Sequence, residues 1–401
     1  MSPATVAGPP GDAAPDPTAL AARAREVLEG NWREPGFCVP HPTTYPWQWL
    51  WDSCFHAVVW RQLGEAERAV VELGNALAHQ ADDGFVPHMT YWSAGGRADD
   101  PTHASFWGRG ATSSITQPPM FGHAVAELHR AGVALPDELV ERSSRGLRFL
   151  VGPRWRDGLG PVIVHPWESG CDDSPRWDAW SGSDTWSPAR AKAVKGELVA
   201  DLCHDADGSP VASTGFEVVA AGFAALVAFN ARELVSVTGD RDLADAADAI
   251  AAALDERWLV DDSGWADAVV VGPPGTTATN VRTAEALLPV LVSSDDVAVA
   301  TALDASIDPD AFGGRFGPAG VHRAEPAFDP HVYWRGATWP QLAYLLWMAA
   351  RRRGHAAADV LRDQLRAGAW RSGFAEYWDP DTGRGGGASP QSWTALAAVV
   401  D

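Results

Sequence analysis

The stretch GFEVVAAGFAALVAFNARELVSVTGDRDLADAADAIAAALDERW, residues 215–258, contains the pattern that decides the fold. Apolar residues recur at helical spacing on both sides of a central Gly-Asp pair, which predicts helices over 215–238 and 241–258. Thr214 and Glu217 have the spacing of an N-terminal capping box. The stretch therefore predicts two antiparallel helices joined by a tight link.

The same periodicity extends over the rest of the chain. Further helices are expected over 17–31, 52–63, 65–80, 118–132, 136–151, 281–291, 295–305, 338–352, 354–367 and 390–400. Short links alternate with long connections, and the long ones cover 81–117, 152–214, 259–280, 306–337 and 368–389. This rhythm predicts an all-α fold, an (α/α)6 toroid whose long active-site loops gather on one rim. An α-solenoid is the main competitor, but its repeats are shorter and more uniform.

Length and charge limit what the chain can be. Its 401 residues fit a single catalytic domain over 17–401, preceded by a disordered leader over 1–16 that is rich in Pro and Ala. The formal net charge of -21, with no basic stripe, argues against nucleic acid and against an anionic membrane surface as partners. No apolar run reaches the roughly 20 residues of a membrane span, and the leader lacks the features of a signal peptide. A cytoplasmic enzyme is expected, and a homo-oligomer is left open.

Metal and cofactor motifs are missing from the sequence. The four cysteines are not spaced as a zinc site or a redox pair, so we expect reduced thiols. The histidines form no HExxH pattern, and neither a phosphate-binding loop with lysine nor a GxSxG elbow occurs. The prediction is an enzyme with no metal and no cofactor.

Aromatic and polar residues cluster in the long connections, close to predicted helix starts. The chain has 20 Trp against 5 Tyr, and aromatic faces among polar groups suit the apolar faces of sugar rings. The clusters cover 45–52, 116–119, 165–178, 333–340 and 374–380 with 391–394. Because the toroid brings these helix starts to one rim, they predict a pocket for a small carbohydrate substrate.

Carboxylates are the reactive groups in these clusters. The candidate acids are Asp52, Glu168, Asp172, Asp173, Asp178 and Glu376. Glycoside hydrolysis needs one carboxylic acid to protonate the leaving oxygen and a second carboxylate as base or nucleophile. Asp172 lies between Trp167 and Trp177, where an apolar setting would raise its pKa. We therefore expect a glycoside hydrolase in which Asp172 acts together with Glu376.

Four motifs resemble glycoside hydrolase family 63. They are Trp-Glu-Ser-Gly-x-Asp-x-Ser-Pro-Arg-Trp-Asp over 167–178, Tyr-Trp-Arg-Gly over 333–336, Glu-Tyr-Trp-Asp-Pro-x-Thr-Gly over 376–383 and Ser-Trp-Thr over 392–394. The resemblance covers roughly residues 40 to 400 and is greatest to the small bacterial branch of mannosylglycerate and glucosylglycerate hydrolases.

The resemblance implies an inverting, exo-acting α-glycosidase with an (α/α)6 toroid and no cofactor. The expected substrate is a small α-glucoside or α-mannoside, with glucosylglycerate as a candidate that has an anionic aglycone. In the family's motifs the general acid falls on Asp172 and the base on Glu376. The implied sugar-binding residues are Tyr45, Trp49, Trp51, Asp52, Tyr91, Gln117, Trp167, Gly170, Tyr333, Trp334, Trp339 and Gln391.

The chain departs from the family in two places. Asp173 stands where the family often has Asn, and a second carboxylate would raise the pKa of the acid beside it. The glycerate hydrolases use an Arg and a Tyr from a mobile loop, and no such pair occurs between the acid motif and residue 217. Arg190, Lys192 and Lys195 lie in that segment instead. They predict either a basic lid for an anionic aglycone or a solvated basic segment.

Two alternative functions stay open at this point. A sugar epimerase or lyase on the same toroid would use His or Tyr as acid and base, with His88 and His331 as candidates. A catalytically silent carbohydrate-binding protein would bind sugar without turnover. The presence of both Asp172 and Glu376 favours hydrolysis over these alternatives.

Overall fold

The computed structural model describes residues 15–92, 101–182 and 186–401, so most of the predicted leader lies outside the described residues. The antiparallel pair predicted around residue 239 forms α8 (Ala221–Thr238) and α9 (Arg241–Asp255). α8 ends at Gly239 in the left-handed conformation, and Asp240 caps α9 by accepting from the amides of Asp242 and Leu243. Such a cap stabilises a helix by about 1 kcal/mol.

The other helices also follow the predicted periodicity, except those over 101–107 and 188–198, which the sequence did not predict. They are α1 (Pro17–Asn31), α2 (Leu50–Gln62), α3 (Ala66–Ala76), α4 (Pro101–Trp107), α5 (Phe121–Arg130), α6 (Asp137–Val151), α7 (Pro188–Leu198), α10 (Asp296–Ile307), α11 (Pro340–Arg353) and α12 (Ala357–Arg371). The 3-10 helices are η1 (Pro166–Ser169), η2 (Pro175–Ser181), η3 (Val199–Asp201), η4 (Val260–Asp262), η5 (Ala284–Leu291) and η6 (Ser392–Ala398).

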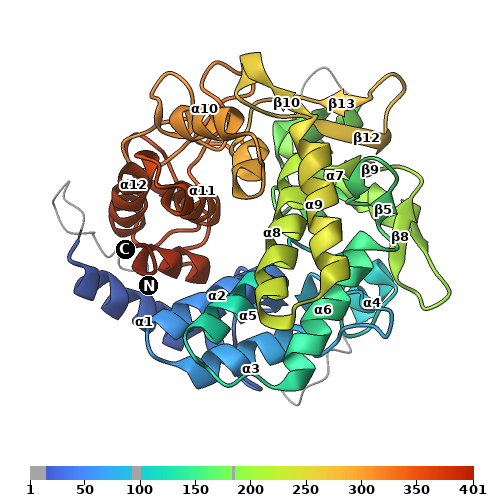
Figure 1. Ribbon diagram of the computed structural model, residues 1–401, viewed down its shortest axis with the longest axis horizontal. Helices are drawn as coiled ribbons and strands as arrows, with labels where there is room; N and C mark the ends of the chain where they lie inside the picture. The colour runs from blue at the N-terminus through green and yellow to red at the C-terminus, as the bar shows by residue number, and fades with distance from the viewer. Residues whose placement is uncertain (1–14, 93–100, 183–185) are drawn as a thin grey trace.

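These elements form a helical toroid, and in Figure 1 they follow one another around a ring in chain order. α2 contacts α5, α5 contacts α8, and the contacts continue through η5, α11 and η6 back to α2. A second set packs outside this ring, with α3 against α2, α6 against α5, α9 against α8, α10 against η5, α12 against α11 and α1 against η6. α8 and α11 are buried over most of their surfaces, as expected for helices enclosed by others.

Three local predictions were wrong. Glu217 does not cap a helix, because it lies in a strand and α8 begins only at Ala221. The helices predicted over 281–291 and 390–400 are the 3-10 elements η5 and η6. Pro289 lies inside η5, where a proline removes one helical hydrogen bond, and this accounts for the tighter winding there.

The connections between the main helices contain more structure than predicted. They hold α4, α7 and short strands: β1 (Trp32–Arg33), β2 (Phe37–Cys38), β3 (Gln48–Trp49), β4 (Met89–Thr90), β5 (Trp155–Arg156), β6 (Gly160–Pro161), β7 (Leu202–His204), β8 (Pro210–Ser213), β9 (Glu217–Val219), β10 (Trp258–Leu259), β11 (Gly264–Trp265), β12 (Asp267–Val271), β13 (Ala278–Thr279), β14 (Tyr377–Trp378) and β15 (Gly385–Gly386). All named pairings are antiparallel, and the largest sheet has the order β13-β12-β9.

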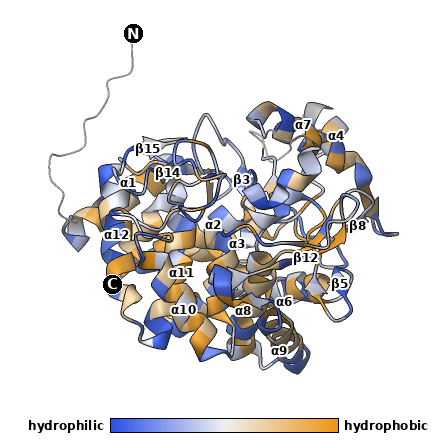
Figure 2. Cartoon of the chain, turned by 90° about the horizontal axis from the view of Figure 1, so that it is seen from above, coloured by the Kyte–Doolittle hydropathy of each residue, from blue (hydrophilic) through white to orange (hydrophobic). Residues whose placement is uncertain are grey.

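The loops and small sheets gather on one side of the helical body, as Figure 2 shows for β3, β14, β15, α4 and α7. This is the predicted rim, where the inner helices begin. Within the described residues, no helix is both long and apolar enough to cross a membrane.

Candidate active site

A pocket of about 380 Å³, including its opening to solvent, lies where the inner helices begin. It is lined by Pro40, Tyr45, Trp49, Trp51, Asp52, Gln117, Gly170, Asp172, Tyr333, Trp334, Glu376, Gln391 and Trp393. All five clusters singled out in the sequence contribute to it, so they converge as predicted.

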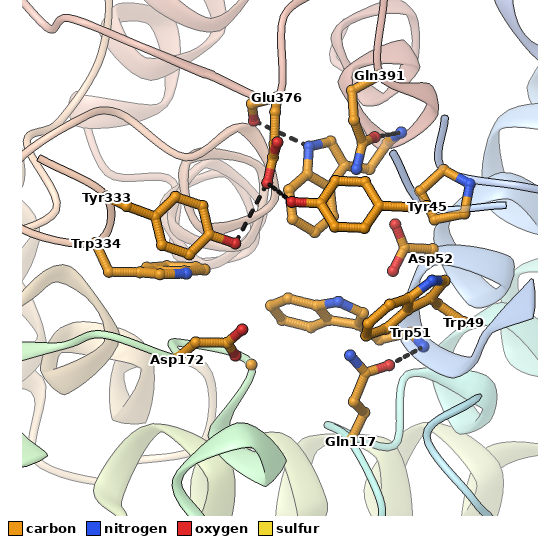
Figure 3. A pocket seen from close by; sticks show the side chains of 13 residues that line it. Tyr45, Trp49, Trp51, Asp52, Gln117, Asp172, Tyr333, Trp334, Glu376 and Gln391 are labelled. Carbon is orange, nitrogen blue, oxygen red and sulfur yellow. Dashed lines mark hydrogen bonds between the residues drawn. The ribbon is translucent and has the colours of Figure 1, made fainter. Parts of the chain in front are cut away.

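The first turn of α2 forms one wall of the pocket, and it carries Trp51 and Asp52 (Figure 3). The Trp51 amide donates to Gln117 Oε1 over 3.4 Å, which ties this turn to the connection before α5. Gly170 has a φ of 75° and lies against the Trp51 ring, since a Cβ there would approach the ring to 2.6 Å. Only glycine meets both conditions at low energetic cost.

Glu376 is held by donors on both carboxyl oxygens. Its Oε1 accepts from the hydroxyls of Tyr45 (3.0 Å) and Tyr333 (3.3 Å), and its Oε2 accepts from the amide of Ala388 (2.8 Å). The Trp393 indole donates to the Glu376 carbonyl over 3.0 Å. Burial raises the pKa of Glu376, and the three donors oppose that rise, which favours the ionised form.

Asp172 faces Glu376 across the pocket (Figure 3). Within the described residues, no hydrogen-bond donor contacts its carboxyl oxygens. Burial raises its pKa to about 7, Lys195 opposes the rise, and Asp173 and Glu376 add to it. As predicted, the buried setting and Asp173 each raise the pKa of Asp172. A carboxyl group with these properties is protonated over much of the neutral range.

Asp52 is a third carboxyl in the pocket and is 3% exposed. Burial raises its pKa to about 7, while His56 and a hydrogen bond with Gln391 lower it. In the described part of the chain, Asp52 Oδ1 and the indole nitrogens of Trp49 and Trp334 are buried without a hydrogen-bond partner. Buried polar atoms without a partner are costly unless a ligand or water pairs with them, so these atoms suit substrate hydroxyls.

The remaining candidate acids are paired with cations. Glu168 is fully buried and forms a two-pronged ion pair with Arg154, with both distances 2.8 Å. Asp178 forms a similar pair with Arg335, and Asp173 pairs with Lys195. None of the three acids lines the 380 Å³ pocket.

Of the predicted sugar-binding residues, three do not line this pocket. Trp339 stacks on Trp334 at 3.5 Å between ring centres, and it thereby supports a lining residue whose φ of 59° is unusual. Tyr91 is buried and accepts from the Trp107 indole. Trp167 packs against Trp107 and His165.

Two lining residues were missed in the sequence. Trp393 belongs to the Ser-Trp-Thr motif, which identified its position but not its role. Pro40 shows no local signal, because it reaches the pocket through contacts far along the chain. Its carbonyl accepts from the Ser392 amide over 3.0 Å and from the Asn31 side chain over 3.1 Å.

The histidines proposed for an epimerase or lyase do not line this pocket. Burial lowers the pKa of His88 to about 3, and His88 bonds Ser113 at 2.5 Å. His331 is exposed and bonds Arg384 at 3.0 Å. Neither histidine is placed to exchange a proton with a sugar bound between Asp172 and Glu376.

Metal-ligating side chains come together at three places in the described residues, namely Cys38-His56-Glu72, His123-Glu127-Glu233 and Asp83-Asp205-Asp207. In the first group, Glu72 already accepts from His56 at 2.6 Å and from Trp60 at 3.0 Å. In the second, Glu233 is paired with arginines. None of these residues lines the pocket, and metal independence remains a prediction.

Comparison with known proteins identifies the family of the chain. The model of the mannosylglycerate hydrolase MGH1-like glycoside hydrolase domain matches residues 45–394. The chain belongs to this family. A mannosylglycerate hydrolase of Thermus thermophilus is 31% identical, over 94% of this chain and 99% of that protein. A glucosylglycerate hydrolase of Mycolicibacterium hassiacum is 29% identical, over 98% and 99% of the two chains.

Solved structures place the chain in the same group. A glycoside hydrolase family 63 mannosylglycerate hydrolase from Thermus thermophilus, in complex with Tris and D-glycerate, superposes with a TM-score of 0.79 at 28% identity. The match covers 95% of this chain and 99% of that one. The resemblance drawn from the sequence motifs is thereby confirmed, and the chain is a glycoside hydrolase.

Proposed function

We propose that this hydrolase is an inverting, exo-acting α-glycosidase with Asp172 as general acid and Glu376 as general base. One observation supports these roles above all others. The Asp172 carboxyl has a raised pKa and no donor in the described residues, whereas Glu376 across the pocket accepts three hydrogen bonds. A protonated acid opposite a held carboxylate is the pair that inverting hydrolysis requires.

In the proposed reaction, Asp172 transfers its proton to the glycosidic oxygen as the bond from that oxygen to the anomeric carbon breaks. Glu376 accepts a proton from a water molecule, and the water oxygen bonds to the anomeric carbon on the opposite face. The products are the free sugar, with inverted configuration, and the released alcohol. This reaction needs neither a metal ion nor a cofactor.

The pocket suits a single terminal sugar ring. The rings of Trp49, Trp51 and Trp334 offer apolar faces, and Asp52 with Gln117 and Gln391 offers polar atoms. Because the pocket is small, we propose that one sugar residue is removed from a short α-glucoside or α-mannoside. An α-glucoside is the first substrate to test.

The place of the aglycone follows from the position of the acid. A second cavity of about 320 Å³ lies beside the first, and Asp172 is the residue that both linings share. A general acid belongs between the sugar and its leaving group. We therefore place the aglycone on the side of the second cavity, whose lining includes Lys195 and Trp186. The relatives named above act on glycosides of glycerate, which makes an anionic aglycone the leading candidate.

The test is a panel of α-glucosides and α-mannosides, each with a neutral and an anionic aglycone, assayed for released monosaccharide. The proposal predicts release from at least one of them, which Asp172→Asn and Glu376→Gln slow by about 10²–10⁴-fold. Sugar that changes configuration or loses water without hydrolysis would favour an epimerase or lyase. Binding without any turnover would identify a silent binding protein.

The proposal also covers the architecture and the cellular compartment. We propose that the toroid is an (α/α)6 arrangement forming one catalytic domain over 17–401, supported by the closed set of inner contacts and the helices packed outside it. The four cysteines are free thiols, which supports a reducing compartment and hence the cytoplasm.

A further inference from the structure

The helix α7 lies against the loop that contains the acid. Its Lys195 donates from Nζ to the main-chain carbonyl of Asp172 over 3.1 Å and forms an ion pair with Asp173. The same ammonium lies 5.8 Å from the centre of the Trp167 ring. The chain has only two lysines, and Lys195 is 7% exposed while Lys192, in the same helix, is exposed.

The main chain of Lys195 is fixed as well. His165 Nε2 bonds the Lys195 carbonyl at 2.8 Å, and His165 Nδ1 accepts from the Trp167 amide over 3.1 Å. Burial lowers the pKa of His165 to about 4, so the ring is neutral and carries its proton on Nε2. The loop 165–173 therefore contacts both the main-chain carbonyl and the side-chain ammonium of Lys195. These contacts fix the position of the ammonium.

The charges around the Asp172 carboxyl act in opposite directions. Burial is the main cause of its raised pKa, Lys195 lowers the pKa, and the carboxylates of Asp173 and Glu376 raise it. The other titratable side chains that interact with Asp172 across the pocket are the hydroxyls of Tyr45 and Tyr333. Among these groups Lys195 supplies the positive charge, and Asp173 partly neutralises it.

We propose that Lys195 is a positioning residue for the acid. It fixes the main chain at Asp172, and together with Asp173 it balances the charge at the acid so that the carboxyl holds a proton yet can release it. The aglycone cavity lies directly beside this ion pair, so the leaving group would meet a neutral pair and not a free cation. This inference rests on the proposed role of Asp172 as the acid.

The opposite effects of the two partners provide the test. Lys195→Met removes the cation and leaves Asp173 charged, so the titration of Asp172 should move to higher pH by about one unit. Asp173→Asn removes the carboxylate and leaves the cation unpaired, so the titration should move to lower pH by a similar amount. The double variant, with neither charge, should titrate between the two single variants.

Two readouts are needed. Carbon-13 NMR of Asp-labelled protein without substrate follows the Asp172 carboxyl, which is identified by its loss in Asp172→Asn. The alkaline limb of the profile of kcat/KM against pH should move in the same direction as the NMR titration in each variant. Lys195→Arg should keep the titration close to that of the wild type, because the positive charge remains.

Lys192→Met is the matched control for the NMR titration, since it removes the other, exposed lysine of the same helix. Single variants that fold but leave the Asp172 titration in place, or move it in the same direction, would overturn the inference. Opposite shifts in a protein that hydrolyses no glycoside would show that the ion pair controls the Asp172 carboxyl, but they would reject the proposed function and with it the catalytic role of Lys195. Hydrolysis of a glycoside without opposite shifts would support the proposed function and reject the inference.

Discussion

The two carboxyls that we propose as acid and base have contrasting surroundings on opposite sides of one pocket. On the base side, Glu376 follows α12 in a hairpin and accepts hydrogen bonds from Tyr45, Tyr333 and the Ala388 amide. On the acid side, Asp172 follows η1, and in the described residues no donor contacts its carboxyl. Instead, the charged side chains of Lys195 and Asp173 shift the pKa of Asp172 in opposite directions.

This difference is what the proposed opposite roles of the two carboxyls require. Hydrogen-bond donors stabilise the ionised form, which a base needs, whereas burial without donors stabilises the protonated form, which an acid needs. Both pKa values are raised by burial, so the donors distinguish the two sides.

The largest expected effect on the rate comes from removing either carboxyl. We expect Asp172→Asn and Glu376→Gln each to lower kcat by about 10²–10⁴-fold, the range for loss of a general acid or base. Thermal unfolding should show that both variants fold. A substrate with a very good leaving group should partly rescue Asp172→Asn but not Glu376→Gln, because only the acid assists departure. Equal rescue of both would contradict the assigned roles.

Near each carboxyl there is also a glycine at a position where an added Cβ would clash with a pocket residue. Gly170→Ala brings a Cβ to 2.6 Å from the Trp51 ring, and Gly387→Ala brings one to 2.3 Å from Glu376 Oε2. Both glycines have positive φ, as does Gly354, where an added Cβ would meet no atom within 4 Å. We expect Gly170→Ala and Gly387→Ala to lower kcat/KM by about 10–100-fold, the effect of misplacing catalytic groups by about 1 Å. Gly354→Ala should alter stability alone.

The tyrosines sharpen the comparison because, of the two carboxyls, only Glu376 accepts hydrogen bonds from them in the described residues. Tyr45→Phe or Tyr333→Phe removes one donor from Glu376, so the pKa of Glu376 should rise. Because the base must be ionised, the acidic limb of the profile of kcat/KM against pH should move to higher pH, with about a tenfold loss of rate. The alkaline limb, assigned to Asp172, should stay in place. A shift of both limbs together would show that the two sides are not separable.

The smallest expected effect concerns the basic segment near the acid. The structure separates the three cations of α7, since Lys195 is buried against the acid loop whereas Arg190 and Lys192 are exposed. If α7 attracts an anionic aglycone, Arg190→Gln with Lys192→Gln should raise KM for an anionic α-glucoside about threefold and leave a neutral one unchanged. Added salt should reduce this difference. Equal KM changes for both substrates would reject the lid.

The sequence predicted the helices that carry a continuous apolar face and the motifs that meet at the rim. It missed α7, since Pro188–Leu198 packs on the acid loop through few buried residues and has no long apolar stripe. It also left Glu168 as a candidate acid, because nothing local to Glu168 reveals its ion pair with Arg154. Neither residue type nor spacing predicts such contacts between distant segments.

The central claim is that Asp172 and Glu376 act from opposite faces of the sugar with a water molecule on the side of Glu376. Proton NMR during hydrolysis of an α-glycoside, recorded before mutarotation, reports the first anomer formed. The account predicts the β-anomer, the product of an inverting site, in which the two carboxyl groups lie about 6.5–9.5 Å apart. The α-anomer as first product would mean retention, and it would contradict the assignment of Glu376 as a base.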